Sequence, residues 1–291
     1  VKLLLNSDKI DVNLKINYHF DKKETNCIEN QEKSPLYLAI EKGNYDIINQ
    51  LLLMREIDVN SKFTSDEIGT FIKYHFEKTP LFLSIDKDLN EVSKKLLSFE
   101  NINVNDLIIK ATKTDASDAL ESQTALHLAI TKQNENISEI LISKENIDIN
   151  AIKIKAYNFC NEKEQKETSP LQIACINGNI KIVNFLLHKK DININFLSKK
   201  LTTKFNYDKI LDKSVKKSLK LSVIEEKTAL HFAIENNSTD IVSLLLSLPD
   251  IDANLRSKTT FDTVNVGIYS SEDLQKIYFP ENFSDKHKKE I

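Results

Sequence analysis

A short motif recurs along the chain at a nearly constant interval, and this periodicity constrains the fold more than any other feature of the sequence. The motif is a hydroxyl residue, then Pro or Ala, then Leu, and its copies start at Ser34, Thr79, Thr124, Ser169 and Thr228. The steps between copies are 45, 45, 45 and 59 residues. A second motif, Ile-Asp-Val-Asn with variants, keeps the same register and ends at Asn13, Asn60, Asn105, Asn150, Asn195 and Asn254. Two independent motifs in one register indicate tandem structural repeats.

One copy of the repeat predicts a helix, a tight turn and a second helix. The hydroxyl residue suits the N-cap, where its oxygen accepts a hydrogen bond from a backbone amide of the first turn. Proline suits the next position, because a missing N–H costs nothing there. Apolar residues follow at helical spacing, and Gly43 or Gly178 then supplies a left-handed turn. A second apolar stripe, such as Ile182, Leu186 and Leu187, predicts the second helix.

Neither short helix could bury its apolar stripe alone, so the units are expected to stack. We predict a stack over residues 1–254, with a partial unit at 1–13 and full units at 34–60, 79–105, 124–150, 169–195 and 228–254. The connections, called fingers below, are 14–33, 61–78, 106–123, 151–168 and 196–227. Residues 255–291 are expected to hold a last finger, a short helix at 271–278 that covers the final unit, and a tail.

Units of this form resemble ankyrin repeats, whose pattern includes Thr-Pro-Leu-His-x-Ala and a Gly between the helices. Residues 124–129 and 228–233 match most of that pattern and keep its histidine, as His127 and His231. The unit at 79–105 departs furthest from it. The resemblance implies a mostly α fold, an ankyrin-type α-solenoid of helix–turn–helix repeats with long β-hairpin or irregular finger insertions. It also implies that His127 and His231 bond the capping hydroxyl and nearby backbone and take no part in catalysis.

The period separates this chain from the family it resembles. Ankyrin units have about 33 residues, whereas the step here is 45 and once 59. The distance from the capping hydroxyl to the last Asn is 26 residues in every full unit, so the additional residues lie in the fingers. Residues 14–20 and 152–156 alternate between polar and apolar, which predicts strands. Fingers lying side by side could therefore form a continuous twisted β-ribbon.

The longest finger has a different pattern. Leu211, Val215 and Leu219 lie at i, i+4 and i+8 among several lysines, which predicts a basic amphipathic helix at 208–221. Two interpretations are open for this helix. It could pack on the stack with its lysines in water, or it could dock an acidic partner or a membrane surface.

The sequence contains no recognisable catalytic or metal-binding pattern. The formal net charge of −3 disfavours nucleic-acid binding, and four scattered glycines cannot build a phosphate-binding loop. The histidines have no spacing suited to zinc. Cys175 lies on an apolar stripe and is expected to be a buried, inert thiol, whereas Cys27 and Cys160 fall in fingers and could be exposed. We therefore expect no enzymatic activity, no cofactor and no metal.

A stack of such units offers a concave surface made of fingers and first helices, where the resemblance implies that another protein binds. The variable pair before each inter-helix turn supplies the candidate contacts, which are Glu41 and Lys42, Asp86 and Lys87, Thr131 and Lys132, Ile176 and Asn177, and Glu235 and Asn236. Lys42, Lys87 and Lys132 would form a row, which is either an ordinary solvated face or a charged ladder that orients the partner.

The favoured function is thus a non-enzymatic protein–protein interaction module or scaffold, expected to be monomeric. The alternative is a regulatory ankyrin segment of a larger enzyme, channel or effector. That alternative is motivated by the lack of an initiator Met and by residues 1–5, which look like a helix already in progress. Three cysteines without a paired spacing, and no signal peptide or membrane-spanning run, predict the cytoplasm or nucleus.

Overall fold

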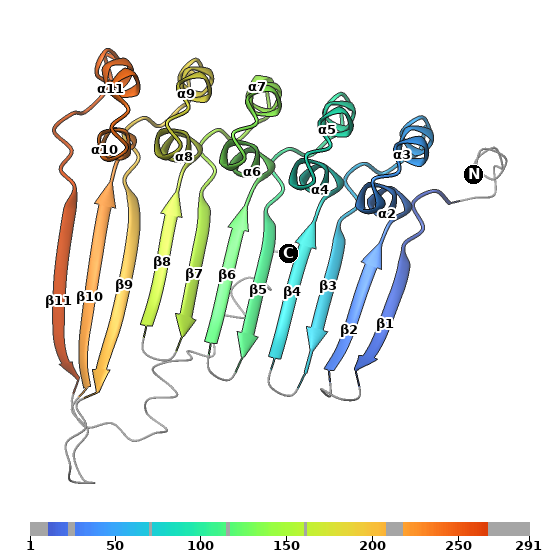
Figure 1. Ribbon diagram of the computed structural model, residues 1–291, viewed down its shortest axis with the longest axis horizontal. Coiled ribbons are helices and arrows are strands. Elements are labelled where there is room, and N and C mark those ends of the chain that lie inside the picture. The colour runs from blue at the N-terminus through green and yellow to red at the C-terminus, as the bar shows by residue number, and fades with distance from the viewer. Residues whose placement is uncertain are drawn as a thin grey trace, which may run out of the picture.

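Five helix pairs stand in a row along the part of the chain that the structure describes, and one wide sheet extends from them (Figure 1). The structure is a computed structural model, and it describes residues 11–22, 27–69, 72–114, 117–159, 162–207 and 218–266. The pairs are α2 (Pro35–Lys42) with α3 (Tyr45–Leu52), α4 (Pro80–Asp86) with α5 (Asn90–Leu97), α6 (Ala125–Thr131) with α7 (Glu135–Ser143), α8 (Pro170–Ile176) with α9 (Ile180–Leu187), and α10 (Ala229–Glu235) with α11 (Thr239–Leu246).

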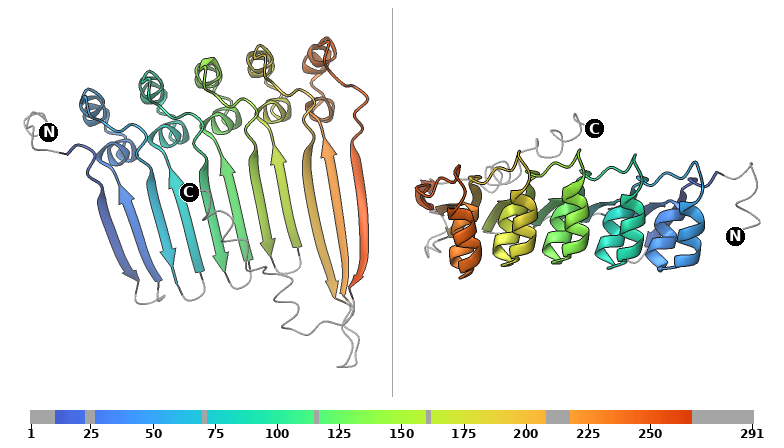
Figure 2. Two further views of the ribbon diagram at one scale, coloured as in Figure 1. Left: turned by 180° about the vertical axis from the view of Figure 1, so that it is seen from behind. Right: turned by 90° about the horizontal axis from the view of Figure 1, so that it is seen from above.

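The fingers form a single antiparallel sheet of eleven strands, whose order in space is their order in the chain. The strands are β1 (Ile16–Lys22), β2 (Cys27–Lys33), β3 (Phe63–Ile68), β4 (Ile72–Lys78), β5 (Ile108–Thr114), β6 (Ser117–Gln123), β7 (Lys153–Phe159), β8 (Glu162–Thr168), β9 (Ser198–Tyr207), β10 (Ser218–Lys227) and β11 (Lys258–Val266). The helix pairs line one end of the strands (Figure 2).

The prediction of a mostly α fold is wrong, because the described residues form one eleven-stranded antiparallel sheet in addition to the helix pairs. The cause is the length of the fingers. Each hairpin is long enough for its outer strand to bond along the next hairpin, as β2 does with β3 from the pair Ile28 and Ile68 to the pair Glu32 and Thr64. The continuous ribbon that side-by-side fingers would allow is therefore present.

The first helix of each unit begins at the hydroxyl residue of the repeated motif. Ser34 Oγ accepts a hydrogen bond from the Tyr37 amide at 3.2 Å, and Thr79 Oγ1 accepts one from the Phe82 amide at 3.1 Å. Three of the second helices are capped in the same way by asparagines that the sequence analysis did not single out, Asn44, Asn134 and Asn179. Because helices of seven to nine residues have few internal bonds, these caps satisfy much of the exposed backbone.

The turn between the two helices requires a left-handed residue in every unit. Gly43 and Gly178 both have φ of 66°, and Asp88, Gln133 and Asn237 take φ of 55–58° at the equivalent positions. A Cβ at Gly178 would lie 2.8 Å from Nδ2 of the Asn236 side chain, which would have to move, so the positive φ is the stronger reason for glycine there. Gln133 adopts the strained conformation at greater cost than glycine would.

The core runs unbroken through the five helix pairs. Leu36, Leu126 and Leu171 at matching positions are at most 1% exposed, and the small residues Ala129 and Ala174 let neighbouring first helices approach closely. Each fully buried leucine stabilises the stack by about 1.5–3 kcal/mol relative to an exposed one. Stability is therefore shared between units, as in other repeat proteins.

The last Asn of each unit ties that unit to the next one. The Asn105 side chain donates to the Asn146 carbonyl at 2.6 Å and accepts from the Asp148 amide at 2.8 Å. The same two bonds, with equivalent partners, are made by Asn13, Asn60, Asn150 and Asn195. This asparagine ladder gives the Ile-Asp-Val-Asn motif a structural role that its sequence alone did not disclose.

Three predicted segments fall wholly or partly outside the described residues. The predicted helix at 208–221 is wrong at its end, because residues 218–221 belong to β10, and residues 208–217 lie outside the described part. Residues 1–10 of the partial unit and the predicted cap at 271–278 also lie outside it. Beyond the last helix pair, the described chain continues into β11.

Candidate partner-binding surface

Lysines at the ends of strands bind acids at the ends of the first helices, where the sheet meets the stack. Lys33 Nζ lies 2.9 Å from Glu41, Lys78 Nζ lies 2.6 Å from Asp86, and Lys227 Nζ lies 2.8 Å from Glu235. Each of these three lysines directly precedes a capping hydroxyl, so the repeat places them at the same corner of three of the five units, and Gln123 and Thr168 hold that position in the other two. The predicted contacts Glu41, Asp86 and Glu235 are therefore already neutralised within the chain.

The second residue of each predicted pair plays different roles in different units. Lys132 Nζ bonds the Asp86 carbonyl at 2.6 Å and both Asp88 carboxylate oxygens at 2.9 Å, so it anchors its unit to the previous one. The Asn177 side chain likewise anchors its unit to the previous one, by donating a hydrogen bond to the Ile130 carbonyl at 2.9 Å. Of the predicted row Lys42, Lys87 and Lys132, the last is therefore already bound within the chain and is not available to a partner.

The remaining predicted contacts are either exposed or hydrogen-bonded within their own unit. Lys42 and Lys87 are exposed, and the Thr131 hydroxyl donates to the His127 carbonyl at 2.7 Å. Ile176 is 36% exposed, and Asn236 bonds the Ser238 hydroxyl at 2.9 Å. Of the ten candidates, the structure brings Ile176, Glu235 and Asn236 together around one cavity, and it does not gather the others.

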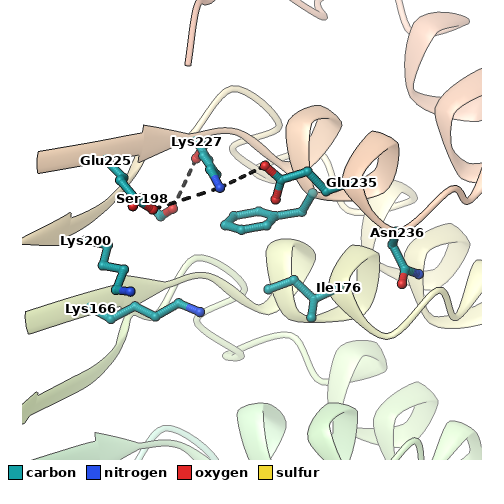
Figure 3. A pocket seen from close by; sticks show the side chains of 9 residues that line it. Lys166, Ile176, Ser198, Lys200, Glu225, Lys227, Glu235 and Asn236 are labelled. Carbon is teal, nitrogen blue, oxygen red and sulfur yellow. Dashed lines mark hydrogen bonds and ion pairs between the residues drawn. The ribbon is translucent and has the colours of Figure 1, made fainter. Parts of the chain in front are cut away.

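That cavity, about 390 Å³ in volume, lies between the ends of α8 and α10 and strands β8 to β10. Figure 3 shows Lys166 and Lys200 side by side on neighbouring strands, with Ile176 on the helix side and Lys227 reaching toward Glu235. The Phe232 ring lines it too, with the Lys166 and Lys227 ammonium groups each 6.0 Å from the ring centre. The cavity is thus lined by three lysines and two glutamates beside an apolar wall.

The sheet face that carries Lys33, Lys78 and Lys227 is called the inner face below. Directly paired residues of an antiparallel sheet lie on the same side, so the strand register identifies its members. One complete line of paired residues, the inner row, crosses all eleven strands. It consists of Tyr18, Gln31, Ser65, Phe76, Lys110, Glu121, Lys155, Lys166, Lys200, Glu225 and Thr259.

Sequence reasoning missed this row, although the signal was present. Lys110, Lys155 and Lys200 are separated by 45 residues, the period of the repeat, and so are Phe76, Glu121 and Lys166. Reading the fingers at the repeat period, as was done for the helices, would have aligned these residues across the sheet.

The inner face is aromatic over the first two hairpins. Tyr37 stacks on Phe63 with ring centres 4.6 Å apart, and Phe76 meets Phe63 edge to face at 6.2 Å. Lys78 Nζ lies 4.9 Å from the centre of the Phe76 ring. Tyr74, next to Phe76, has a raised pKa because of burial and the nearby carboxylates of Glu29 and Glu67. This end of the face is therefore an aromatic cluster held by cation–π contacts.

The two motif histidines lie at the starts of their helices. His127 Nδ1 is 2.8 Å from the Thr124 hydroxyl, and His231 Nδ1 is 2.7 Å from that of Thr228. The pKa of His127 is lowered to about 4, mainly by burial and also by the charge of Lys153, while backbone hydrogen bonding with Ala151 and Thr168 partly offsets both effects. This arrangement is a buried neutral ring that holds a helix start.

Cysteines offer no reactive group among the described residues. Burial raises the pKa of the Cys175 thiol to about 12, which suppresses the reactive thiolate. Cys27, for which the sequence left exposure open, is buried at 5% exposure, and Cys160 lies outside the described part. Within the described ranges, no three His, Cys, Asp or Glu side chains gather as a metal site.

None of the helices described has the length and apolar character required to cross a bilayer. The architecture thus defines a class of protein before any comparison, a stack of helix–turn–helix repeats whose hairpins fuse into one sheet.

Comparison with known families agrees with that class. A model of three consecutive ankyrin repeats matches residues 104–198, and a single ankyrin repeat model matches residues 31–62 and 225–258. These segments cover more than half of the 291 residues, and the chain belongs to the ankyrin repeat family. The divergent unit at 79–105 lies almost wholly outside the matches, yet it forms α4 and α5 like its neighbours. No curated protein matches the chain. Ankyrin repeats are non-catalytic modules that generally mediate protein–protein interactions.

Proposed function

We propose that the chain binds a partner protein on the inner face of its sheet and the adjoining ends of its first helices. The observation that carries the proposal is the cavity of about 390 Å³ at the corner between α8, α10 and strands β8 to β10. It combines an aromatic ring, an aliphatic side chain and several charged groups, a mixture that suits protein recognition. We expect the chain to act as a monomeric scaffold in the cytoplasm or nucleus.

The two faces of the sheet provide a matched test. Thr202 and Leu201 are neighbours in β9, but Thr202 lies on the inner face and Leu201, 36% exposed, lies on the opposite one. A photo-crosslinking benzoylphenylalanine replaces either residue, and the protein is irradiated in extracts of its native cells.

Partner adducts identified by mass spectrometry are expected from position 202 and not from position 201. Adducts that form equally at both positions, or only at 201, would contradict binding on the inner face. Circular dichroism of both modified chains checks that neither substitution disturbs the fold.

A further inference from the structure

Three adjacent lysines of the inner row depart from the way charges are arranged elsewhere along it. The order across strands β6 to β10 is Glu121, Lys155, Lys166, Lys200 and Glu225. Each end lysine faces one glutamate, whereas Lys166 faces a lysine on both sides. Like charges directly opposite one another on a sheet are unfavourable, so this arrangement does not serve the sheet itself.

Two of the acids around these lysines are bound by lysines outside the row, and a third, Glu164, is bound by Lys200 within it. Glu121 lies 3.0 Å from Lys153, and Glu235 lies 2.8 Å from Lys227. Glu164 pairs with Lys200 at 3.3 Å. Among the described residues, no carboxylate lies within ion-pair distance, 4.0 Å, of the Lys155 or Lys166 ammonium group. Two neighbouring ammonium groups of the lysine row, those of Lys155 and Lys166, are therefore left without a direct ion pair in the described part of the chain.

Lys166 is also positioned toward the cavity. Its side chain is half-buried, and its ammonium group lies 6.0 Å from the centre of the Phe232 ring. Burial lowers the pKa of Lys166, the charges of Lys200 and Lys227 lower it further, and the carboxylates of Glu164 and Glu225 offset part of this effect. An anion placed between Lys166 and Lys200 would relieve the repulsion between them.

From this geometry we infer that Lys155, Lys166 and Lys200 bind carboxylates of an acidic, extended segment of the partner protein, with Phe232 and Ile176 contacting its apolar side chains. The inference rests on the proposed function and specifies the chemistry of the partner. Neighbouring strands lie about 4.8 Å apart, so the outer lysines are separated by about 10 Å. In an extended segment, alternate side chains lie about 7 Å apart on one face, so two glutamates at i and i+2 fit within the row.

The test uses a short fluorescein-labelled peptide of alternating Glu and Val residues, and a matched peptide with Gln in place of Glu. Fluorescence anisotropy with the full chain is expected to show tighter binding of the Glu peptide, which weakens as salt is raised. Lys166→Gln should weaken that binding about threefold to fivefold, as expected for a partly exposed ion pair. Lys110→Gln, which alters a lysine of the same row on β5, should leave it unchanged.

A second variant separates binding from folding. Lys166→Glu makes the row alternate in charge, so it should abolish binding of the Glu peptide and at the same time raise the melting temperature. Equal binding of the Glu and Gln peptides, or equal losses from the changes at Lys166 and Lys110, would overturn the inference. So would a single-stranded DNA oligonucleotide that binds as tightly as the Glu peptide, because the row would then be a general anion surface.

The chain that carries benzoylphenylalanine at position 202 distinguishes this inference from the proposed function on which it rests. If adducts at position 202 persist after Lys166→Glu, inner-face binding stands and the lysine row is excluded from it. If adducts never form at position 202, even with all three lysines in place, the proposed function itself fails.

Discussion

The two ends of the inner face are built on the same scaffold and differ in what their side chains already bind. Over β1 to β4 the aromatic rings stack on one another, and Lys33 and Lys78 each bind both an acid and a ring. Over β7 to β9, Lys155 and Lys166 have no acidic partner among the described residues, and a cavity lies beside them. The difference shows that equal repeats can pair the charges of one region within the chain and leave ammonium groups of another without a direct ion pair among the described residues.

The largest expected effect tests the structural role of the aromatic end. Phe63 is 6% exposed and contacts both Tyr37 and Phe76. Phe63→Ala should lower the free energy of unfolding by about 3–5 kcal/mol, measured by urea unfolding followed with circular dichroism. Phe232→Ala, at the half-buried ring of the cavity, should cost less than half as much. Equal losses would remove the distinction between the two ends.

Acid should weaken the unit between the two ends. The pKa of His127 is about 4 in the folded chain against 6.5 for the free side chain, so the unfolded state takes up a proton more readily. The free energy of unfolding should therefore fall as the pH drops from about 6.5 to about 4, by up to about 3 kcal/mol. In His127→Gln, which introduces the residue found at Gln172 in the next unit, that part of the pH dependence should disappear. If the free energy of unfolding of His127→Gln falls with pH as steeply as that of the unmodified chain, other groups cause the acid sensitivity.

The asparagine ladder should contribute equally to stability at both ends of the stack. Asn60 and Asn150 each make one donated and one accepted bond to the next unit, and both would leave two backbone groups without partners if truncated. Asn60→Ala and Asn150→Ala should each cost about 2 kcal/mol in thermal or urea unfolding. A large difference between the two would show that the scaffold itself, and not only the inner face, differs along the stack.

The smallest effects have opposite signs at the two ends. Lys78→Glu breaks the 2.6 Å contact with Asp86 and should lower the free energy of unfolding by about 1 kcal/mol. Lys166→Glu removes the repulsion within the lysine row and should raise it by about 0.5 kcal/mol. Melting temperatures of the two variants, compared with that of the unmodified chain in the same buffer, test whether the two changes in stability have opposite signs. A destabilised Lys166→Glu chain would mean that the lysine row supports the sheet.

The helix pairs were predictable because their signals are local. The hydroxyl cap at Ser34, the proline that follows it and the turn at Gly43 lie within ten residues of one another. The sheet was only partly predictable, since its fingers were expected to be strands but pair between hairpins that are far apart in sequence. Lys132 shows the same limit, because its partners Asp86 and Asp88 lie 46 and 44 residues away. Which charges remain available to a partner depends on such contacts between units.

Because the strands follow one another in chain order, the width of the sheet grows with the number of units. One additional 45-residue unit placed between existing ones would insert two strands, widening the sheet by about 10 Å. It would add two positions to every line of paired residues and leave the contacts within the other units unchanged. Duplication or deletion of whole units therefore gives evolution a simple way to change the length of the inner face without redesigning the units that remain.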